Sequence, residues 1–207
     1  IDMVPAYYAG HSLGEYSALV AGNSLSIIEA LTLVRKRGEL MELAPQGSMS
    51  AIMGLEYDII NEICSTLSMD ENFHVQCANL NSPSQTVISG HDEAVNKAQD
   101  LCLSRGAKRA IKLKVSIASH SKLMLSAADE FQHTLESIKF RMPDTKIIHN
   151  ASVNTASSTA EIPSLLVSQL HLPVRWVETC QFISTLNLPI LECGPGKVLS
   201  GLFKANN

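Results

Sequence analysis

The sequence predicts an α/β protein in which an α/β-hydrolase-like core with a parallel sheet carries an inserted ferredoxin-like (βαββαβ) subdomain. Three observations lead to this fold class. Residues 6–22 contain an apolar run, a turn with the pattern Gly10-x-Ser12-x-Gly14, and a helix-forming segment. Residues 48–115 contain segments in the order strand, helix, strand, strand, helix, strand. Residues 146–149 supply a further short apolar strand for the core.

The glycine-rich turn has the context of a nucleophile elbow, in which a serine lies between a strand and a helix. Two glycines allow a sharp turn and a close approach of strand and helix. The apolar residues that follow have the spacing of one helix face, and Gly22-Asn23 is a stop signal. Free N–H groups at the helix N-terminus would favour negative charge developing near Ser12. The alternative is a structural turn followed by a helix N-cap.

A long helix and the insertion come next. Ser24 and Ser26 offer N-caps for a helix over residues 27–43, which residues 44–47 end. The insertion has strands at residues 48–55, 74–78, 85–89 and 110–115 and helices at residues 56–67 and 91–104. This order predicts a small sheet with helices on one face. Because it begins and ends beside segments with candidate site residues, we assign residues 48–115 to a separate subdomain.

Residues 1–47 and 116–207 form the predicted catalytic core. After a loop at residues 116–121 we expect helices at 122–137, 163–170 and 174–186, strands at 146–149 and 189–193, and a last helical turn after residue 197. A parallel strand that carries an elbow is normally buried between neighbours. The elbow strand begins almost at Ile1, so we expect that this chain lacks preceding residues. Its C-terminal end also has the character of a truncation.

Composition and charge narrow the classes of partner. The chain is 45% hydrophobic and 17% charged, and its net charge of −4 gives no reason to expect a nucleic acid or an anionic membrane. No apolar run is long enough to span a membrane. The five cysteines form no CxxC pair, which is typical of reduced thiols in a cytoplasmic protein. The sequence therefore predicts neither a metal site nor a cofactor.

A serine nucleophile needs a base, and seven histidines compete for that role. His120 is the best candidate, because it lies in a loop of small residues just after a predicted strand. His11 lies inside the elbow itself and is badly placed to act as the base. The acidic residues between Ser12 and His120 that could orient an imidazole are unconvincing, since they lie on or beside the second helix of the insertion. A backbone carbonyl could orient the histidine instead.

Arg37 is the candidate for substrate recognition. It follows Ser12 by 25 residues within an otherwise apolar helix, whereas its neighbours Arg35 and Lys36 fit a solvated helix face. A guanidinium near a serine nucleophile offers a bidentate fork to a carboxylate. This combination indicates an acyl donor with a free acid group, such as malonyl.

Five ordered motifs together resemble malonyl-CoA:acyl-carrier-protein transacylases of bacterial type II fatty acid synthesis. The motifs are Gly10-His11-Ser12-Leu13-Gly14-Glu15-Tyr16-Ser17-Ala18-Leu19, Arg37-Gly38, Asn79-Leu80-Asn81-Ser82-Pro83, Val115-Ser116 with Ser119-His120-Ser121, and Glu192-Cys193-Gly194-Pro195-Gly196-Lys197-Val198-Leu199. The resemblance covers nearly the whole chain. It implies S-malonyltransferase activity with malonyl-CoA and acyl carrier protein as partners, no cofactor, and a monomer.

The resemblance also implies a role for each site residue. Ser12 would form a malonyl-serine ester, and His120 would be the base, oriented by the main-chain carbonyl of Gln169. The N–H of Leu13 would donate to the oxyanion. Substrate-binding residues would be Arg37 on the malonyl carboxylate, Met41 in the pocket wall, and His11, Asn79 and Asn81 near the site. Kinetics would be ping-pong.

This sequence departs from the family pattern in ways that bear on activity. It lacks the N-terminal Gly-Gln-Gly segment that supplies a second oxyanion donor, and it lacks the C-terminal helices. We therefore expect this chain alone to be poorly active. Two other readings remain: a serine hydrolase or thioesterase on the same elbow, and an acyltransferase domain of a polyketide synthase or another larger synthase, either active or serving as a scaffold.

Overall fold

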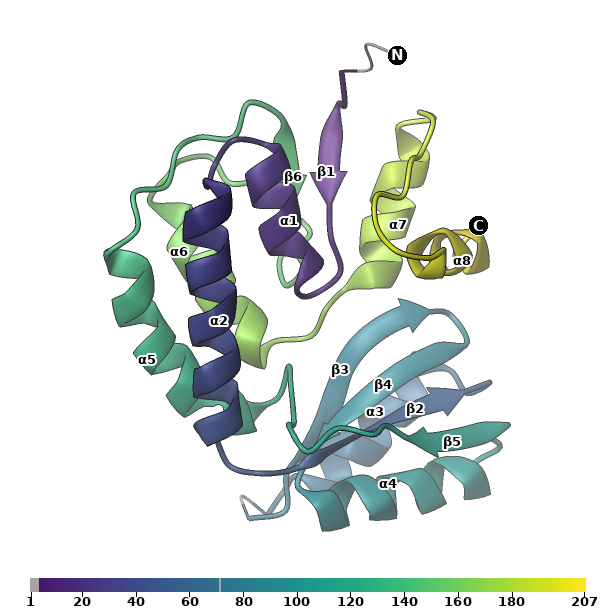
Figure 1. Cartoon of the computed structure of the whole chain (residues 1–207). Helices are drawn as coiled ribbons and strands as arrows, with labels where there is room; N and C mark the ends of the chain where they lie inside the picture. The colour runs from purple at the N-terminus through teal and green to yellow at the C-terminus, as the bar shows by residue number, and fades with distance from the viewer. Residues whose placement is uncertain (1–3, 71) are drawn as a thin grey trace.

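The computed structural model describes residues 4–70 and 72–207 and shows a mixed α/β protein with two lobes (Figure 1). The upper lobe contains two parallel strands and most of the helices, and the lower lobe contains an antiparallel sheet. The elements are β1 (Tyr7–Ala9), α1 (Gly14–Ala21), α2 (Ile27–Leu43), β2 (Ser48–Met53), α3 (Tyr57–Leu67), β3 (Val75–Ser82), β4 (Gln85–Gly90), α4 (Asp92–Ser104), β5 (Arg109–Lys112), the 3-10 turn η1 (Lys122–Met124), α5 (Leu125–Glu136), β6 (Lys146–Ile148), α6 (Glu161–His171), α7 (Trp176–Thr185) and α8 (Val198–Ala205).

The upper lobe is built on β1 and β6, which pair in parallel with Tyr8 opposite Ile147. Parallel strands deliver their carboxyl ends to the same edge of a sheet. The chain leaving β1 therefore enters the elbow beside the chain leaving β6. This edge of the small sheet positions the candidate site.

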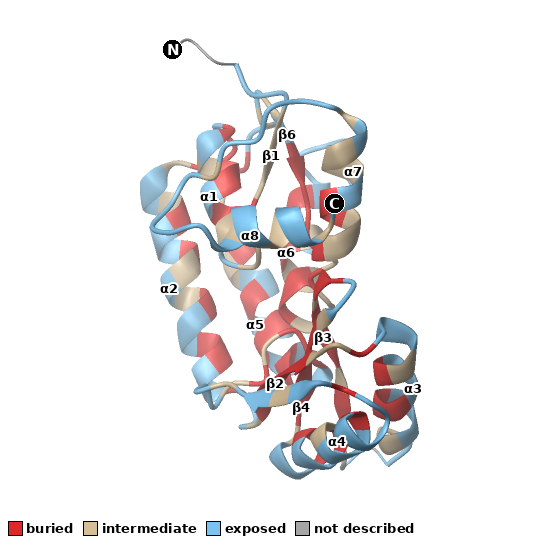
Figure 2. Ribbon diagram, turned by 90° about the vertical axis from the view of Figure 1, so that its right-hand side faces the viewer, coloured by how far each residue is buried: buried red, intermediate tan, exposed pale blue. Residues whose placement is uncertain are grey.

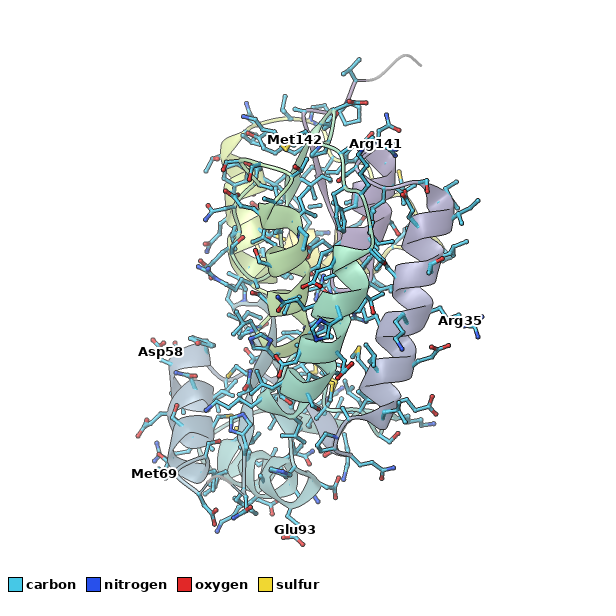
Figure 3. All side chains as sticks on the ribbon, turned by 90° about the vertical axis from the view of Figure 1, so that its left-hand side faces the viewer. Arg35, Asp58, Met69, Glu93, Arg141 and Met142 are labelled. Carbon is cyan, nitrogen blue, oxygen red and sulfur yellow. The ribbon has the colours of Figure 1, made fainter. Side chains whose placement is uncertain are left out.

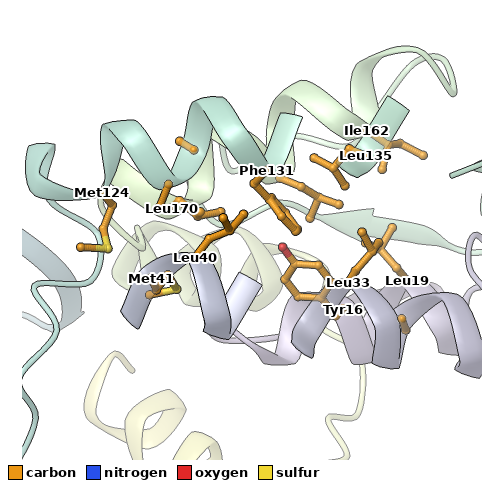
Figure 4. Packing of buried hydrophobic residues seen from close by; sticks show 14 of the residues in the cluster. Tyr16, Leu19, Leu33, Leu40, Met41, Met124, Phe131, Leu135, Ile162 and Leu170 are labelled. Atoms are coloured by element: carbon orange, nitrogen blue, oxygen red, sulfur yellow. The ribbon is translucent and has the colours of Figure 1, made fainter. Parts of the chain in front are cut away.

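Helices α1, α2, α5 and α6 surround the larger hydrophobic core (Figure 4). Tyr16 from α1 packs edge-on against Phe131 from α5, with ring centroids 6.5 Å apart. The helix α2 starts at a capping box, in which Ser26 and Glu29 satisfy each other's backbone N–H groups. Figure 2 shows that the buried faces of these helices point inward, so the elbow rests on a rigid packed support.

The lower lobe has four antiparallel strands in the order β3-β4-β2-β5. The helices α3 and α4 lie together against one side of this sheet (Figure 1) and bury a second apolar cluster that includes Ile52, Ile60 and Ile88. The predicted succession of strand, helix, strand, strand, helix, strand is the observed one. The opposite face of the sheet carries a smaller apolar cluster formed by Met49, Ala51, Ala78 and Val87, so both faces of these strands bury apolar residues.

Several predicted elements differ from the structure, and the strands predicted at residues 48–55 and 110–115 are shorter, ending at Met53 and Lys112. Residues 189–193 were expected to form a strand, but they are irregular, and Ile190 and Leu191 are exposed. A strand needs a hydrogen-bonded neighbour, and no strand in the described part of the chain pairs with this segment. Strand β3 extends to Ser82, beyond the predicted end at residue 78, because register shifts accommodate its polar second half.

No helix within residues 4–70 and 72–207 is long and apolar enough to cross a membrane.

We expect the two glycines of the elbow to differ in their tolerance of alanine. A Cβ on Gly10 would lie 2.0 Å from the carbonyl oxygen of Gly14, whereas a Cβ on Gly14 meets no atom within 4 Å. Gly10→Ala should therefore lower the free energy of unfolding by more than about 2 kcal/mol. Gly14→Ala should change it by less than about 1 kcal/mol, since alanine is the better helix former.

Urea unfolding of the full-length protein measures both changes. Equal midpoints for the two variants would contradict this account of the turn.

Candidate active site

The backbone of the elbow holds Ser12 in the left-handed region, with φ of 50°. Asn150, which follows β6, fixes this turn from across the sheet edge. Its Oδ1 accepts a hydrogen bond from the Ser12 N–H at 2.6 Å, and its Nδ2 donates to the carbonyl of Gly10 at 2.6 Å. A non-glycine residue in this conformation is strained and needs such support. The strain is that of a nucleophile elbow, which projects its serine from a sharp turn.

His120 lies against the serine hydroxyl. The Ser12 Oγ–H donates to His120 Nε2 at 2.8 Å, and His120 Nδ1 donates to the main-chain carbonyl of Gln169 at 2.7 Å. A carbonyl oxygen only accepts, so it places the ring proton on Nδ1 and leaves the Nε2 lone pair toward Ser12. The imidazole is buried, being only 2% exposed. This arrangement can remove a proton from the hydroxyl.

The surroundings of His120 keep its ring neutral. Burial and, as a smaller contribution, the positive charge of Arg37 together lower the pKa of His120 to about 3. A neutral imidazole at pH 7 is the form that can accept a proton.

Arg37 brings a buried positive charge to the same place. Its Nη2 lies 3.4 Å from Ser12 Oγ and 3.4 Å from Gln169 Oε1. Its Nε is buried without a hydrogen-bond partner. Within the described residues no aspartate or glutamate oxygen lies within 4.0 Å of this guanidinium. A buried cation without a counter-ion is costly, and an anionic ligand would relieve that cost.

The exposed residue Arg35 is the contrast on the same helix. Figure 3 shows its side chain pointing into solvent, where it pairs with Glu39 at 2.8 Å. The two arginines of α2 therefore have different environments, as the sequence predicted.

Leu13 supplies a free backbone donor beside the serine. It precedes the first residue of α1, and no group in the described part of the chain accepts a hydrogen bond from its N–H. Such an N–H at a helix start can stabilise negative charge on a nearby oxygen.

The remaining predicted site residues are His11, Asn79, Asn81 and Met41, of which His11 and Asn81 contact each other. His11 lies beside Asn81, with Nε2 and Oδ1 2.8 Å apart, and near the Trp176 ring. Burial lowers the pKa of His11, which keeps this ring neutral at pH 7. Asn79 is buried in β3 and forms a bridge with Val174 rather than a contact with Ser12.

Met41 packs in the larger hydrophobic core (Figure 4). Its predicted place in a pocket wall stays a prediction.

Sequence reasoning missed four contributors to the site. They are Asn150, Glu15, His149 and the side chain of Gln169. One signal was available for Asn150, because a polar residue directly after a strand parallel to the elbow strand lies at the same sheet edge. Among the described residues no group of three histidine, cysteine or acidic side chains could hold a metal ion.

The chain is similar to proteins of known family. A family model described as "Acyl transferase domain" matches residues 3–196. The malonyl CoA-acyl carrier protein transacylase of Haemophilus influenzae is 44% identical over 207 residues, covering 98% of this chain and 66% of that protein. The Bacillus subtilis protein of the same name is 43% identical over 209 residues, with coverage of 99% and 66%. The chain thus spans just under two thirds of these relatives.

Solved structures agree with this similarity. The malonyl CoA-acyl carrier protein transacylase of Coxiella burnetii has a TM-score of 0.95 at 42% identity, covering 99% of this chain and 66% of that one. A complex described as a type II PKS acyl-carrier protein with its malonyl-transacylase has a TM-score of 0.94 at 43% identity, with coverage of 99% and 67%.

We expect Arg37→Ala to raise the pKa of His120. Removing a nearby positive charge makes protonation of the ring less costly, so the titration midpoint should rise by about one pH unit. The ¹³Cε1 chemical shift of His120, followed by NMR on acidification, measures it. Arg35→Ala removes an exposed charge and is the control. A midpoint that is the same in both variants would show that Arg37 does not act on this ring.

Proposed function

The chain belongs to the acyl transferase domain family, and we propose that it transfers a malonyl group from malonyl-CoA to the phosphopantetheine thiol of an acyl carrier protein in fatty acid synthesis. The observation that carries the malonyl assignment is Arg37, a buried guanidinium without a carboxylate partner among the described residues, 3.4 Å from the serine oxygen. The substrate carboxylate would supply the missing counter-ion through a bidentate contact.

In the first half-reaction Ser12 is the nucleophile. His120 Nε2 takes the hydroxyl proton as Oγ attacks the thioester carbonyl, and the carbonyl electron pair moves onto its oxygen. The Leu13 N–H donates to that oxyanion. The intermediate then collapses, the carbon–sulfur bond breaks, and the proton on His120 passes to the sulfur of coenzyme A. The product is a malonyl-serine ester.

The second half-reaction reverses these steps with another thiol. His120 takes the proton from the phosphopantetheine thiol, whose sulfur attacks the ester carbonyl, and Ser12 leaves with that proton. The Gln169 carbonyl holds the ring in one tautomer throughout, in the way an aspartate does in a serine protease triad. No net proton is gained or lost over the cycle.

The secondary substrate contacts belong to the same proposal. His11 and Asn81 form a hydrogen-bonded pair on the side of the elbow that faces Trp176, and Asn79 lies on the same strand as Asn81. Met41 would line the pocket one turn after Arg37.

The finer classification of the fold is also proposed. Residues 1–47, of which 1–3 lie outside the described part, and 116–207 would form the α/β-hydrolase-like core, and residues 48–115 the ferredoxin-like subdomain. The order β3-β4-β2-β5, with two helices on one face, supports the subdomain. Gly47 N–H donates to the carbonyl of Ser116 at 3.2 Å, so the entry and exit of the insertion lie together.

We also propose that the protein is cytoplasmic and monomeric.

A serine hydrolase on the same elbow is the competing function. It would use water as the acceptor and would need no buried cation beside the serine. The charge of the acyl group therefore separates the two proposals.

We expect the full-length protein incubated with malonyl-CoA to gain the mass of one malonyl group. Ser12→Ala removes the attacking oxygen, so the adduct should be absent and transfer should fall by about 10⁴-fold. Intact-mass spectrometry measures the adduct. Wild-type protein that carries no adduct and transfers no malonyl group would overturn the proposed function.

Arg37→Ala should change selectivity between acyl donors. We expect kcat/KM for malonyl-CoA to fall by about a hundredfold, because a buried charge-assisted contact is lost. The value for acetyl-CoA, which has no carboxylate, should fall far less. Equal losses for both donors would contradict the carboxylate contact, and Arg35→Ala is the matched control on the same helix.

A further inference from the structure

A second buried charge lies beneath the elbow and takes no part in the proposed reaction. Glu15, on α1, is fully buried and has no lysine or arginine partner among the described residues. Its Oε1 accepts from His149 Nδ1 at 2.6 Å. Its Oε2 accepts from the Asn150 N–H at 3.0 Å and from Gln169 Nε2 at 2.8 Å. This carboxylate therefore joins three elements of the upper lobe.

The bond to Gln169 fixes which way round its side-chain amide lies. Gln169 Nε2 donates to Glu15 Oε2 at 2.8 Å and to the carbonyl of Ser12 at 3.0 Å. Both of these groups are acceptors only. A flipped amide would turn its oxygen toward two oxygens and its NH₂ toward a guanidinium. The carboxylate thus holds the amide in the orientation in which Oε1 faces Arg37 Nη2, at 3.4 Å.

We propose that Glu15 is a positioning residue that sets the preference for a charged acyl group, acting on Arg37 through the amide of Gln169. The inference rests on the proposed function, since it concerns the same malonyl contact. Gln169 Oε1 and Ser12 Oγ each lie 3.4 Å from Arg37 Nη2, and the Tyr16 ring, whose centroid is 6.0 Å from the guanidinium carbon, is a further neighbour. Without the amide oxygen, the long arginine side chain would lose a fixed position and part of its affinity for a carboxylate.

The same carboxylate also supports the nucleophile. Its bond to the Asn150 N–H steadies the residue whose side chain holds Ser12 and Gly10. Loss of Glu15 should therefore reduce turnover of every acyl donor to some extent. A purely structural role would reduce malonyl and acetyl transfer by the same factor. Only the ratio of the two kcat/KM values reports on Arg37.

The test compares Glu15→Met with Glu15→Gln in the full-length protein, using malonyl-CoA and acetyl-CoA. Glu15→Met removes the acceptor for Gln169, so the malonyl-to-acetyl ratio should fall about tenfold, the effect of losing about one hydrogen bond. Glu15→Gln keeps an oxygen for Gln169 and Asn150 if its NH₂ faces His149, whose ring can move its proton to Nε2. The ratio should then stay within about threefold of wild type.

A variant of Gln169 tests the same path from its other end. Gln169→Met removes the amide oxygen but keeps the main-chain carbonyl that orients His120, and it should lower the ratio to a similar extent. The malonyl-to-acetyl ratio of the double variant Glu15→Met/Gln169→Met should be no lower than that of either single variant, because both changes remove the same contact between Gln169 Oε1 and Arg37. If Glu15→Met does not fold, Glu15→Ala, which also removes the acceptor for Gln169 Nε2 and favours the helix, takes its place.

Ser24→Ala is the control for general destabilisation. It removes a fully buried hydroxyl that donates to the Arg141 carbonyl at 2.7 Å, beyond the far end of α1, and should leave the ratio unchanged. A wild-type ratio in folded Glu15→Met would overturn the inference, whatever the Gln169→Met ratio is, while leaving the proposed function intact. Wild-type protein with no malonyl transfer would instead overturn the proposed function itself.

Discussion

The parallel pairing of β1 with β6 is the constraint on which the site depends. It joins only three residue pairs, from Tyr7 with Lys146 to Ala9 with Ile148, yet it brings the ends of two distant segments together. The elbow then meets the side chain of Asn150, which bonds the backbone on both sides of the turn. Ser12 keeps a strained conformation because of these bonds, and the Leu13 N–H just before α1 has no acceptor among the described residues.

Gln169 connects His120 and Arg37, the two site residues that lie outside the elbow. Its main-chain carbonyl orients His120, and its side-chain amide contacts both Arg37 and the carbonyl of Ser12. Leu166 and Leu170 on the same helix are fully buried in the larger core. The packing of α6 thus fixes the base and the cation relative to the serine, because a well-packed helix offers few alternative positions.

Local signals explain what the sequence could predict. The elbow, the long helix with one buried arginine and the order of elements in residues 48–115 follow from spacing, caps and glycines within short windows. The bonds of Ser12 to Asn150 and of Gln169 to Glu15 span 138 and 154 residues, and no local pattern encodes such contacts. The prediction of a strand at residues 189–193 was wrong for the same reason, because a strand requires a hydrogen-bonded partner as well as an apolar run.

The low pKa of His120 has two consequences for catalysis, and a bound acid group beside Arg37 would change the balance between them. In the free protein burial, and after it the positive charge of Arg37, lowers the pKa of His120, which keeps the ring neutral but makes it a weak base. Under the proposed function, a malonyl carboxylate beside Arg37 would offset that positive charge and raise the basicity of His120 when the hydroxyl must lose its proton. A neutral acyl donor would gain neither the contact nor the stronger base. Selectivity would therefore arise in the chemical step as well as in binding.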